Sequence, residues 1–142
     1  MKGVMTMKKR VVKLCFLFFF IVLSSCFKDD TGIIQNFIAY PNPFSALKDN
    51  HITFKTTFKT TDITEYQWTL NIYTENGNLT YTSSNTVTAV ASPLIINWPA
   101  RDNAGHVVSS GIYTAIIRLE VTKDSVGYSA GTYQDRCYTV IH

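Results

Sequence analysis

Apolar and polar residues alternate along several short stretches of this sequence, and that alternation restricts the chain to a β-rich fold. The apolar residues fall on every second position between Tyr66 and Thr74, and again between Ile112 and Val121. Because side chains of a β-strand point alternately to opposite faces, a period of two indicates strands with one buried face. No stretch beyond residue 32 has convincing helical spacing. The pattern therefore predicts antiparallel sheets with one face toward a core and one toward water.

Turn residues separate these stretches at short intervals. We predict strands over residues 33–40, 52–58, 66–74, 79–82, 94–98, 112–121 and 132–141. Glu75-Asn76-Gly77-Asn78 predicts a hairpin turn, because Asn and Gly accept positive φ at low cost. About seven to eight short strands with regular turns are typical of an Ig-like antiparallel β-sandwich. We therefore expect residues 33–142 to form one all-β domain.

The first 25 residues have the three parts of a secretory signal. Val11 to Leu23 is almost wholly apolar, and the small residues Ser24 and Ser25 follow it. The basic residues that precede or open this run are Lys8, Lys9, Arg10 and Lys13. Such a segment is removed rather than folded. The alternative is a short anchor helix, but the apolar run is shorter than the about 20 residues that a membrane span needs.

Leu23-Ser24-Ser25-Cys26 resembles a lipobox, the site at which bacterial lipoproteins are cut and lipidated. The resemblance implies that residues 1–25 are removed, that the Cys26 thiol takes a diacylglycerol group and that the new N-terminus is acylated. Several acyl chains, such as palmitate, anchor stably because each buried methylene contributes about 0.8 kcal/mol. The alternative is an ordinary apolar cysteine within a signal. We expect a membrane to be the first partner, reached through lipid on Cys26.

Residues 26–32 are predicted to be the lipidated cysteine and a polar tether. Lys28-Asp29-Asp30 in this segment resembles the export signal of surface lipoproteins in the Bacteroidetes group. The resemblance implies that Lys28, Asp29 and Asp30 direct the protein to the outer face of the outer membrane. The alternative is a solvated charged tether without an export role, which any lipoprotein can carry.

The charge of the predicted mature chain excludes a nucleic-acid partner. Five of the thirteen basic residues lie in the signal, which leaves eight basic and ten acidic residues and a net charge of −2. No basic patch remains that would bind phosphates. Cys137 is the one cysteine left beside the lipidated one, so no intramolecular disulfide is expected, and it is predicted to lie in or near the core.

Three segments, taken in order, resemble the Ig-like domain of flagellar hook-capping proteins and the C-terminal sorting domains of type IX secretion. They are Tyr40–Phe44, Leu70–Gly77 and Trp98–Tyr113. The resemblance implies the sandwich fold and no catalytic residue. In that family an acidic or amide residue and a glycine commonly follow the tryptophan. Pro99 and Ala100 stand there in this chain, so we expect the turn to differ.

Catalytic and metal-binding constellations are not predicted. His106 lies near Ser109 and Ser110, but no Gly-x-Ser-x-Gly motif accompanies them, and such residues more often bond to the backbone of a turn. Asp102 and Asn103 are predicted to form a turn rather than a calcium site, because they fall far short of the six to eight oxygen ligands of calcium. No histidine spacing suits zinc. We expect no enzyme, no metal and no cofactor.

A non-catalytic protein-interaction or assembly module is the function that these features favour. The domain would dock onto an envelope protein that the sequence does not name. The alternative is a surface lipoprotein that binds glycans through exposed tyrosines, since these offer contact area at low entropy cost. The tyrosines less clearly assigned to the core are Tyr73, Tyr81, Tyr128, Tyr133 and Tyr138.

Overall fold

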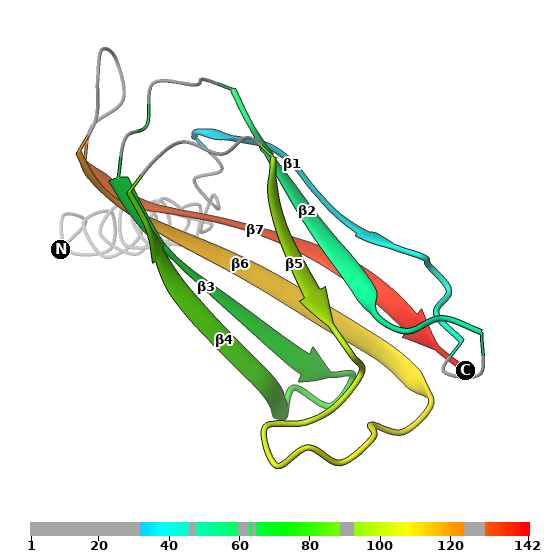
Figure 1. Cartoon of the computed structure of the whole chain (residues 1–142). Coiled ribbons are helices and arrows are strands. Elements are labelled where there is room, and N and C mark those ends of the chain that lie inside the picture. The colour runs from blue at the N-terminus through cyan, green and yellow to red at the C-terminus, as the bar shows by residue number, and fades with distance from the viewer. Residues whose placement is uncertain (1–31, 46–47, 60–62, 64, 89–92, 124–129) are drawn as a thin grey trace, which may run out of the picture.

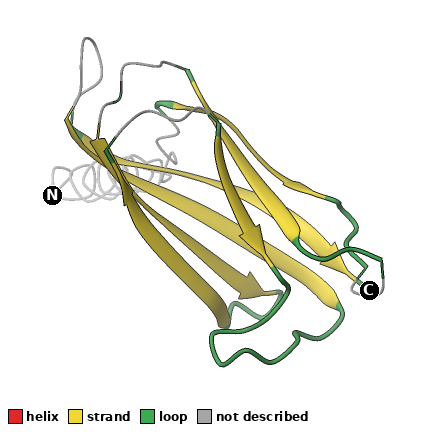
Figure 2. Cartoon of the chain, in the orientation of Figure 1, coloured by secondary structure: helices red, strands yellow, loops and turns green. Residues whose placement is uncertain are grey.

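Two antiparallel β-sheets pack face to face in the computed structural model of the chain (Figure 1). The structure describes residues 32–45, 48–59, 63, 65–88, 93–123 and 130–142. Its seven strands are β1 (Ile34–Tyr40), β2 (Ile52–Phe58), β3 (Glu65–Thr74), β4 (Leu79–Val87), β5 (Leu94–Trp98), β6 (Gly111–Lys123) and β7 (Gly131–Ile141). Strands and loops make up all of this part (Figure 2), and no helix within it is long and apolar enough to cross a membrane.

The strand order is that of an Ig-like sandwich. One sheet has three strands in the order β1-β2-β5, and the other has four in the order β4-β3-β6-β7. Neighbouring strands pair antiparallel throughout both sheets. The chain changes sheet between β2 and β3, between β4 and β5, and between β5 and β6. The predicted fold class, an all-β antiparallel β-sandwich, is confirmed.

Six of the seven strands begin and end within two residues of the predicted bounds. The exception is β4, which continues to Val87 where the alternation predicted an end at residue 82. Its second half places Val87 against the core, whereas Ser84, Asn85 and Thr86 are all exposed. That segment is a strand because its backbone pairs with β3, as in Trp68 opposite Asn85. Backbone pairing does not require apolar residues at alternate positions, so it leaves no such pattern in the sequence.

The core is dominated by aromatic side chains from both sheets. Trp98 is fully buried, and its ring lies 5.8 Å from that of Tyr113, 6.0 Å from Tyr81 and 6.4 Å from Phe54. Each aromatic pair of this kind contributes about 0.5–1.5 kcal/mol beyond its buried area. The indole Nε1 donates a hydrogen bond to the carbonyl of Arg101 at 2.7 Å. Trp98 therefore joins the two sheets and fixes the start of the following loop.

The predicted hairpin turn between β3 and β4 is confirmed. Gly77 has a φ of 80°, and its N–H donates to the carbonyl of Thr74 at 2.9 Å. The N–H of Thr74 in turn donates to the carbonyl of Asn78 at 2.9 Å. Glycine suits this position because it adopts positive φ without a Cβ clash.

The turn after Trp98 passes through a left-handed residue although it carries no glycine. Ala100 has a φ of 53° and is buried, with 1% of its surface exposed. Its carbonyl accepts a hydrogen bond from the N–H of Val108 at 3.0 Å. At this position the chain differs in residue type from the domains that it resembles. Ala100 nevertheless adopts a positive φ, the conformation that glycine adopts most readily.

Candidate interaction surface

Several residues singled out from the sequence fall outside the described residues. These are Cys26, Lys28, Asp29, Asp30 and Tyr128. The described domain begins where the predicted tether ends, since the carbonyl of Ile33 accepts a hydrogen bond from the N–H of Lys59 at 2.9 Å. The lipid anchor and the export signal therefore remain predictions.

The outer face of the four-stranded sheet carries apolar side chains at one end. The register places Thr114 of β6 opposite Tyr73 of β3 on one side and Tyr138 of β7 on the other. Two residues before Thr114 in β6, Ile112 lies opposite Val140. Paired residues share a face of the sheet, so these side chains gather on the side away from the core.

We call this region the outer apolar patch. Its members are Tyr73, Leu79, Ile112, Ile116, Tyr138 and Val140. Tyr138 is 57% exposed, Leu79 53% and Ile112 46%. Isolated apolar residues are normal on a surface, whereas a contiguous group marks an interaction site. The patch crosses all four strands, β4 through Leu79 and β7 through Tyr138.

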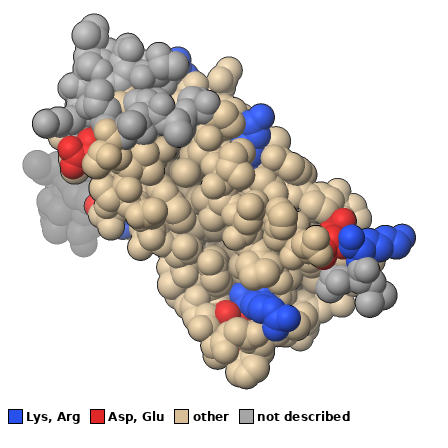
Figure 3. All heavy atoms as spheres, viewed as in Figure 1, with Lys and Arg blue, Asp and Glu red and all other residues tan. Residues whose placement is uncertain are grey.

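Charged and polar side chains follow the patch along the same outer face. Arg118 and Glu120 of β6 form an ion pair with an N–O distance of 2.9 Å, and about half of each side chain is exposed. Gln67 of β3 lies opposite Glu120. The outer face thus divides into an apolar end and a polar end. On the face of the molecule shown in Figure 3, most of the surface is neither acidic nor basic, and some of the few charged side chains lie beside a side chain of opposite charge.

A side chain closes the free edge of β7 beside the patch. The Asn42 Nδ2 donates to the carbonyl of Tyr138 at 2.9 Å, and its Oδ1 accepts from the N–H of Val140 at 3.0 Å. Phe44, the next residue but one, is buried, and its N–H donates to the carbonyl of Val140 at 2.7 Å. The Tyr40–Phe44 motif therefore acts as an additional short strand along β7.

At the other edge of this sheet, Asn103 binds backbone groups of β4. Its Oδ1 accepts a hydrogen bond from the N–H of Thr82 at 3.1 Å, and its own N–H donates to the carbonyl of Thr80 at 3.3 Å. The sequence predicts only a turn at Asn103. Its contacts with β4 depend on tertiary structure that local patterns do not reveal.

The loop that contains Asn103 is stabilised by an aspartate. The Asp102 Oδ1 accepts from the N–H groups of Ala104 and His106 at 2.9 and 2.8 Å. The pKa of Asp102 is lowered, chiefly because the backbone N–H of His106 stabilises the charged carboxylate. Its Oδ2 lies 3.3 Å from the His106 Nδ1. Turn formation, the predicted role of Asp102, accounts for these bonds.

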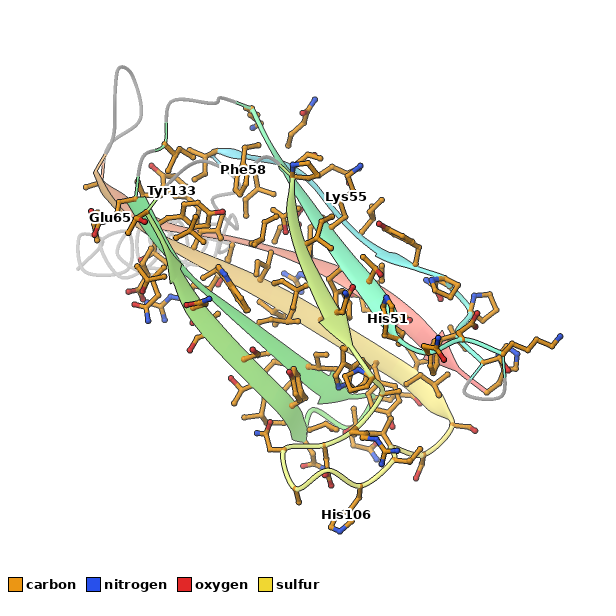
Figure 4. All side chains as sticks on the ribbon, in the orientation of Figure 1. His51, Lys55, Phe58, Glu65, His106 and Tyr133 are labelled. Carbon is orange, nitrogen blue, oxygen red and sulfur yellow. The ribbon has the colours of Figure 1, made fainter. Side chains whose placement is uncertain are left out.

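His106 points away from the sandwich into solvent (Figure 4), and 80% of its side chain is exposed. Among the described residues, neither Ser109 nor Ser110 forms a hydrogen bond with it. The carbonyl of Ser109 instead accepts from the Tyr113 hydroxyl at 2.7 Å. No group of three or more potential metal ligands occurs in the described part of the chain.

The tyrosines separate into buried and exposed groups. Tyr133 is buried, with 8% of its surface exposed, and lies toward the same end of the domain as Phe58 (Figure 4). Tyr81 is half-buried against Trp98. Tyr73 and Tyr138 are on the outer face, about 10 Å apart because β6 lies between their strands.

The aliphatic members of the patch were not singled out from the sequence. A signal for them was present, because Ile112 and Ile116 occupy the otherwise polar face of the longest alternating stretch. Cys137 is half-buried against the core, as predicted. Burial is the first cause that raises the pKa of its thiol to about 12, and the charge of Asp135 adds to it.

Fold and surface together define an Ig-like antiparallel β-sandwich with an exposed apolar face. The sequence matches no protein-family model and no curated protein. Among solved structures, the chain is similar to dimeric latent PorU from Porphyromonas gingivalis, with a TM-score of 0.57 and 18% identity. The match covers 74% of this chain and 9% of that chain. Likeness at this identity concerns the fold alone, and the resemblance to hook-capping and sorting domains stays a prediction.

Proposed function

We propose that this protein is a non-catalytic interaction module, held by lipid on Cys26 at the outer membrane and facing the cell surface. The outer apolar patch is the observation that carries the docking part of this proposal. Exposed apolar side chains from four strands offer a partner protein area to bury, and burial of apolar area drives most protein association. The location rests on the sequence resemblances at Cys26 and at Lys28-Asp29-Asp30.

The patch also favours a face-on mode of docking. At the patch end of the sheet, Asn42 and Asn103 already bind edge groups of β7 and β4. A partner that approaches there meets side chains of the outer face rather than a free backbone edge. Tyr138 is the most exposed member of the patch and is expected to contribute most, since tyrosine is enriched among residues that dominate binding energy.

The test compares two matched surfaces of the same domain. The double variant Ile112→Ser and Tyr138→Ser changes the patch, whereas Ile38→Ser and Ile95→Ser change exposed residues of the three-stranded sheet. Each chain is immobilised and exposed to detergent-solubilised envelope from the producing cells. We expect a discrete envelope protein to be retained by the native chain and the control but lost by the patch variant. Equal retention by all three chains, or none by the native chain, would contradict docking through the patch.

Glycan binding is a second candidate, favoured by the two outward tyrosines on one row of the sheet. Tyr73 and Tyr138 flank Thr114, and such a pair of rings could stack on sugar rings of one oligosaccharide. The two candidates differ in what they require of Tyr138. Stacking on a sugar needs an aromatic ring, so Tyr138→Phe should keep glycan-array binding and Tyr138→Leu should abolish it. Protein docking through apolar area should survive both changes better than Tyr138→Ser.

A further inference from the structure

The strand β4 lies at the edge of its sheet, and no described strand pairs with its outer side (Figure 1). In an antiparallel ladder, successive residues direct their N–H and C=O groups alternately toward and away from the neighbouring strand. The N–H groups of Thr82 and Thr86 bind side chains rather than β3. Ser84 lies midway between them, so its N–H and C=O also face outward.

Part of this edge is already occupied. Asn103 binds the carbonyl of Thr80 and the N–H of Thr82, and the N–H of Thr86 donates to the Oδ1 of its neighbour Asn85 at 2.8 Å. Within the described part of the chain, no bond reaches the outward groups of Ser84 or the carbonyl of Thr82. The free backbone groups are therefore centred on Ser84.

The opposite edge of the sheet differs. On β7, Asn42 and Phe44 occupy backbone groups of Tyr138 and Val140, and the N–H of Arg136 donates to the Asp135 Oδ1 at 2.8 Å. A free strand edge is a template for pairing with another chain, and natural sheets protect such edges with charges, prolines or bulges. The open half of β4, from Ser83 to Val87, contains no charged residue and no proline.

We propose that two copies of this protein pair antiparallel through β4, about a two-fold axis at Ser84. Ser84 and the partner's Ser84 then exchange two backbone hydrogen bonds. Asn85 releases the N–H of Thr86, which donates to the carbonyl of the partner's Thr82, and symmetry repeats that bond. The same register places the carbonyl of the partner's Thr86 at the N–H of Thr82, so the Asn103 Oδ1 releases that N–H. The N–H of Asn103 keeps its bond to the carbonyl of Thr80, which ends the pairing there. The two four-stranded sheets join into one continuous sheet.

Charge favours a second copy as the occupant of this edge. Around the axis each residue faces its own symmetry mate or a nearby one, so any charge on β4 would oppose a like charge. The strand has none between Leu79 and Val87. Thr82 instead faces the partner's Thr86, and hydroxyl pairs of this kind stabilise neighbouring strands. This contact uses the edge of the sheet and is independent of the outer apolar patch.

The test places charges at the axis. In Ser84→Lys or Ser84→Glu, the new side chain faces its own copy, whereas an equimolar mixture brings opposite charges together. The full chains are extracted in mild detergent, and their association is measured by sedimentation. We expect the native chain to dimerise, each variant alone to bind itself about fivefold or more weakly, and the mixture to recover dimers. All of these chains have the same N-terminal residues, so any effect of that segment on association is the same in each.

Two further variants sharpen the result. Ser84→Pro removes the outward N–H, so it should lose the dimer and keep the circular-dichroism spectrum of the native sheet, because edge positions tolerate proline. The patch variant with Ile112→Ser and Tyr138→Ser should dimerise like the native chain. A native chain that stays monomeric, or lysine and glutamate variants that self-associate as tightly as it does, would overturn the proposal.

Discussion

Three buried hydroxyls lack a hydrogen-bond partner in the described part of the chain: those of Thr56, Tyr66 and Thr139. An unpaired buried hydroxyl keeps its desolvation cost without compensation. We therefore expect Thr56→Val and Tyr66→Phe each to raise the free energy of unfolding by about 1 kcal/mol. Urea denaturation followed by tryptophan fluorescence measures the change. As a control, Tyr113→Phe removes a hydroxyl that does have an acceptor, Ser109, and should destabilise the domain. If Tyr66→Phe is destabilising to the same extent, its hydroxyl has a partner after all.

Asn42 is a single residue whose side chain replaces a stretch of backbone pairing. Asn42→Ala removes two bonds to β7 and leaves the carbonyl of Tyr138 and the N–H of Val140 unpaired at an exposed edge. We expect a loss of about 1–2 kcal/mol in the free energy of unfolding. Asn42→Asp keeps the acceptor for Val140 but turns an oxygen toward the Tyr138 carbonyl, so it should not restore stability. Thermal unfolding of both variants checks this, and native stability in Asn42→Asp would contradict the orientation of the amide.

At the scale of elements, alternation predicted every strand whose inner face fills the core. Ile52–Phe58 and Leu94–Trp98 were predicted with the observed bounds because large apolar residues occupy the alternate positions, with Thr56 as the exception. The edges and the outer face were not predictable in this way. The second half of β4 depends mainly on backbone pairing with β3, and Asn42 contacts Tyr138 although the two residues are 96 positions apart in the sequence. A sequence pattern shows the periodicity within a segment, but it does not show which distant segment lies beside that segment.

The predicted role of the N-terminal tether is to direct the protein to the cell surface, and it is not expected to stabilise the domain. Changing Lys28, Asp29 and Asp30 to Ala should leave the free energy of unfolding within about 0.5 kcal/mol, because they precede the first strand. Lipidation should continue, and protease added to intact cells should digest the native protein and spare the variant. Equal digestion would make the segment a plain tether, and no digestion of either would place the protein in the periplasm.

Cys26→Ala addresses the anchor itself and serves as the matched control for the tether variant. It removes the predicted acylation site, so labelling with a fatty-acid probe should vanish, whereas the triple tether variant should label like the native chain. The reason is chemical, since alanine has no thiol to receive the diacylglycerol group. Labelling that persists in Cys26→Ala would refute the lipobox.

The whole molecule should lose stability in alkali. Burial raises the pKa of Cys137 from its ordinary 9.0 to about 12, and burial also raises the pKa of Tyr66 and Tyr113. The unfolded chain therefore releases these protons first, so the stability present below pH 9 is lost as the pH rises toward 12. Each such proton contributes up to about 1.4 kcal/mol per pH unit. Cys137→Ala should flatten the fall in unfolding free energy above pH 9, measured in urea at several pH values. An unchanged slope would show that Cys137 does not titrate in this way.

The bond between Asn42 and Val140 has a consequence for the order in which the domain is made. These residues lie 98 positions apart, so the sandwich closes only after β7 has left the ribosome. Folds that depend on such distant pairing form slowly, because the entropy cost of closing a long loop comes before the stabilising contact forms. On the export route proposed above, that delay is useful. A chain whose β7 has not yet been synthesised stays unfolded and can be threaded across a membrane.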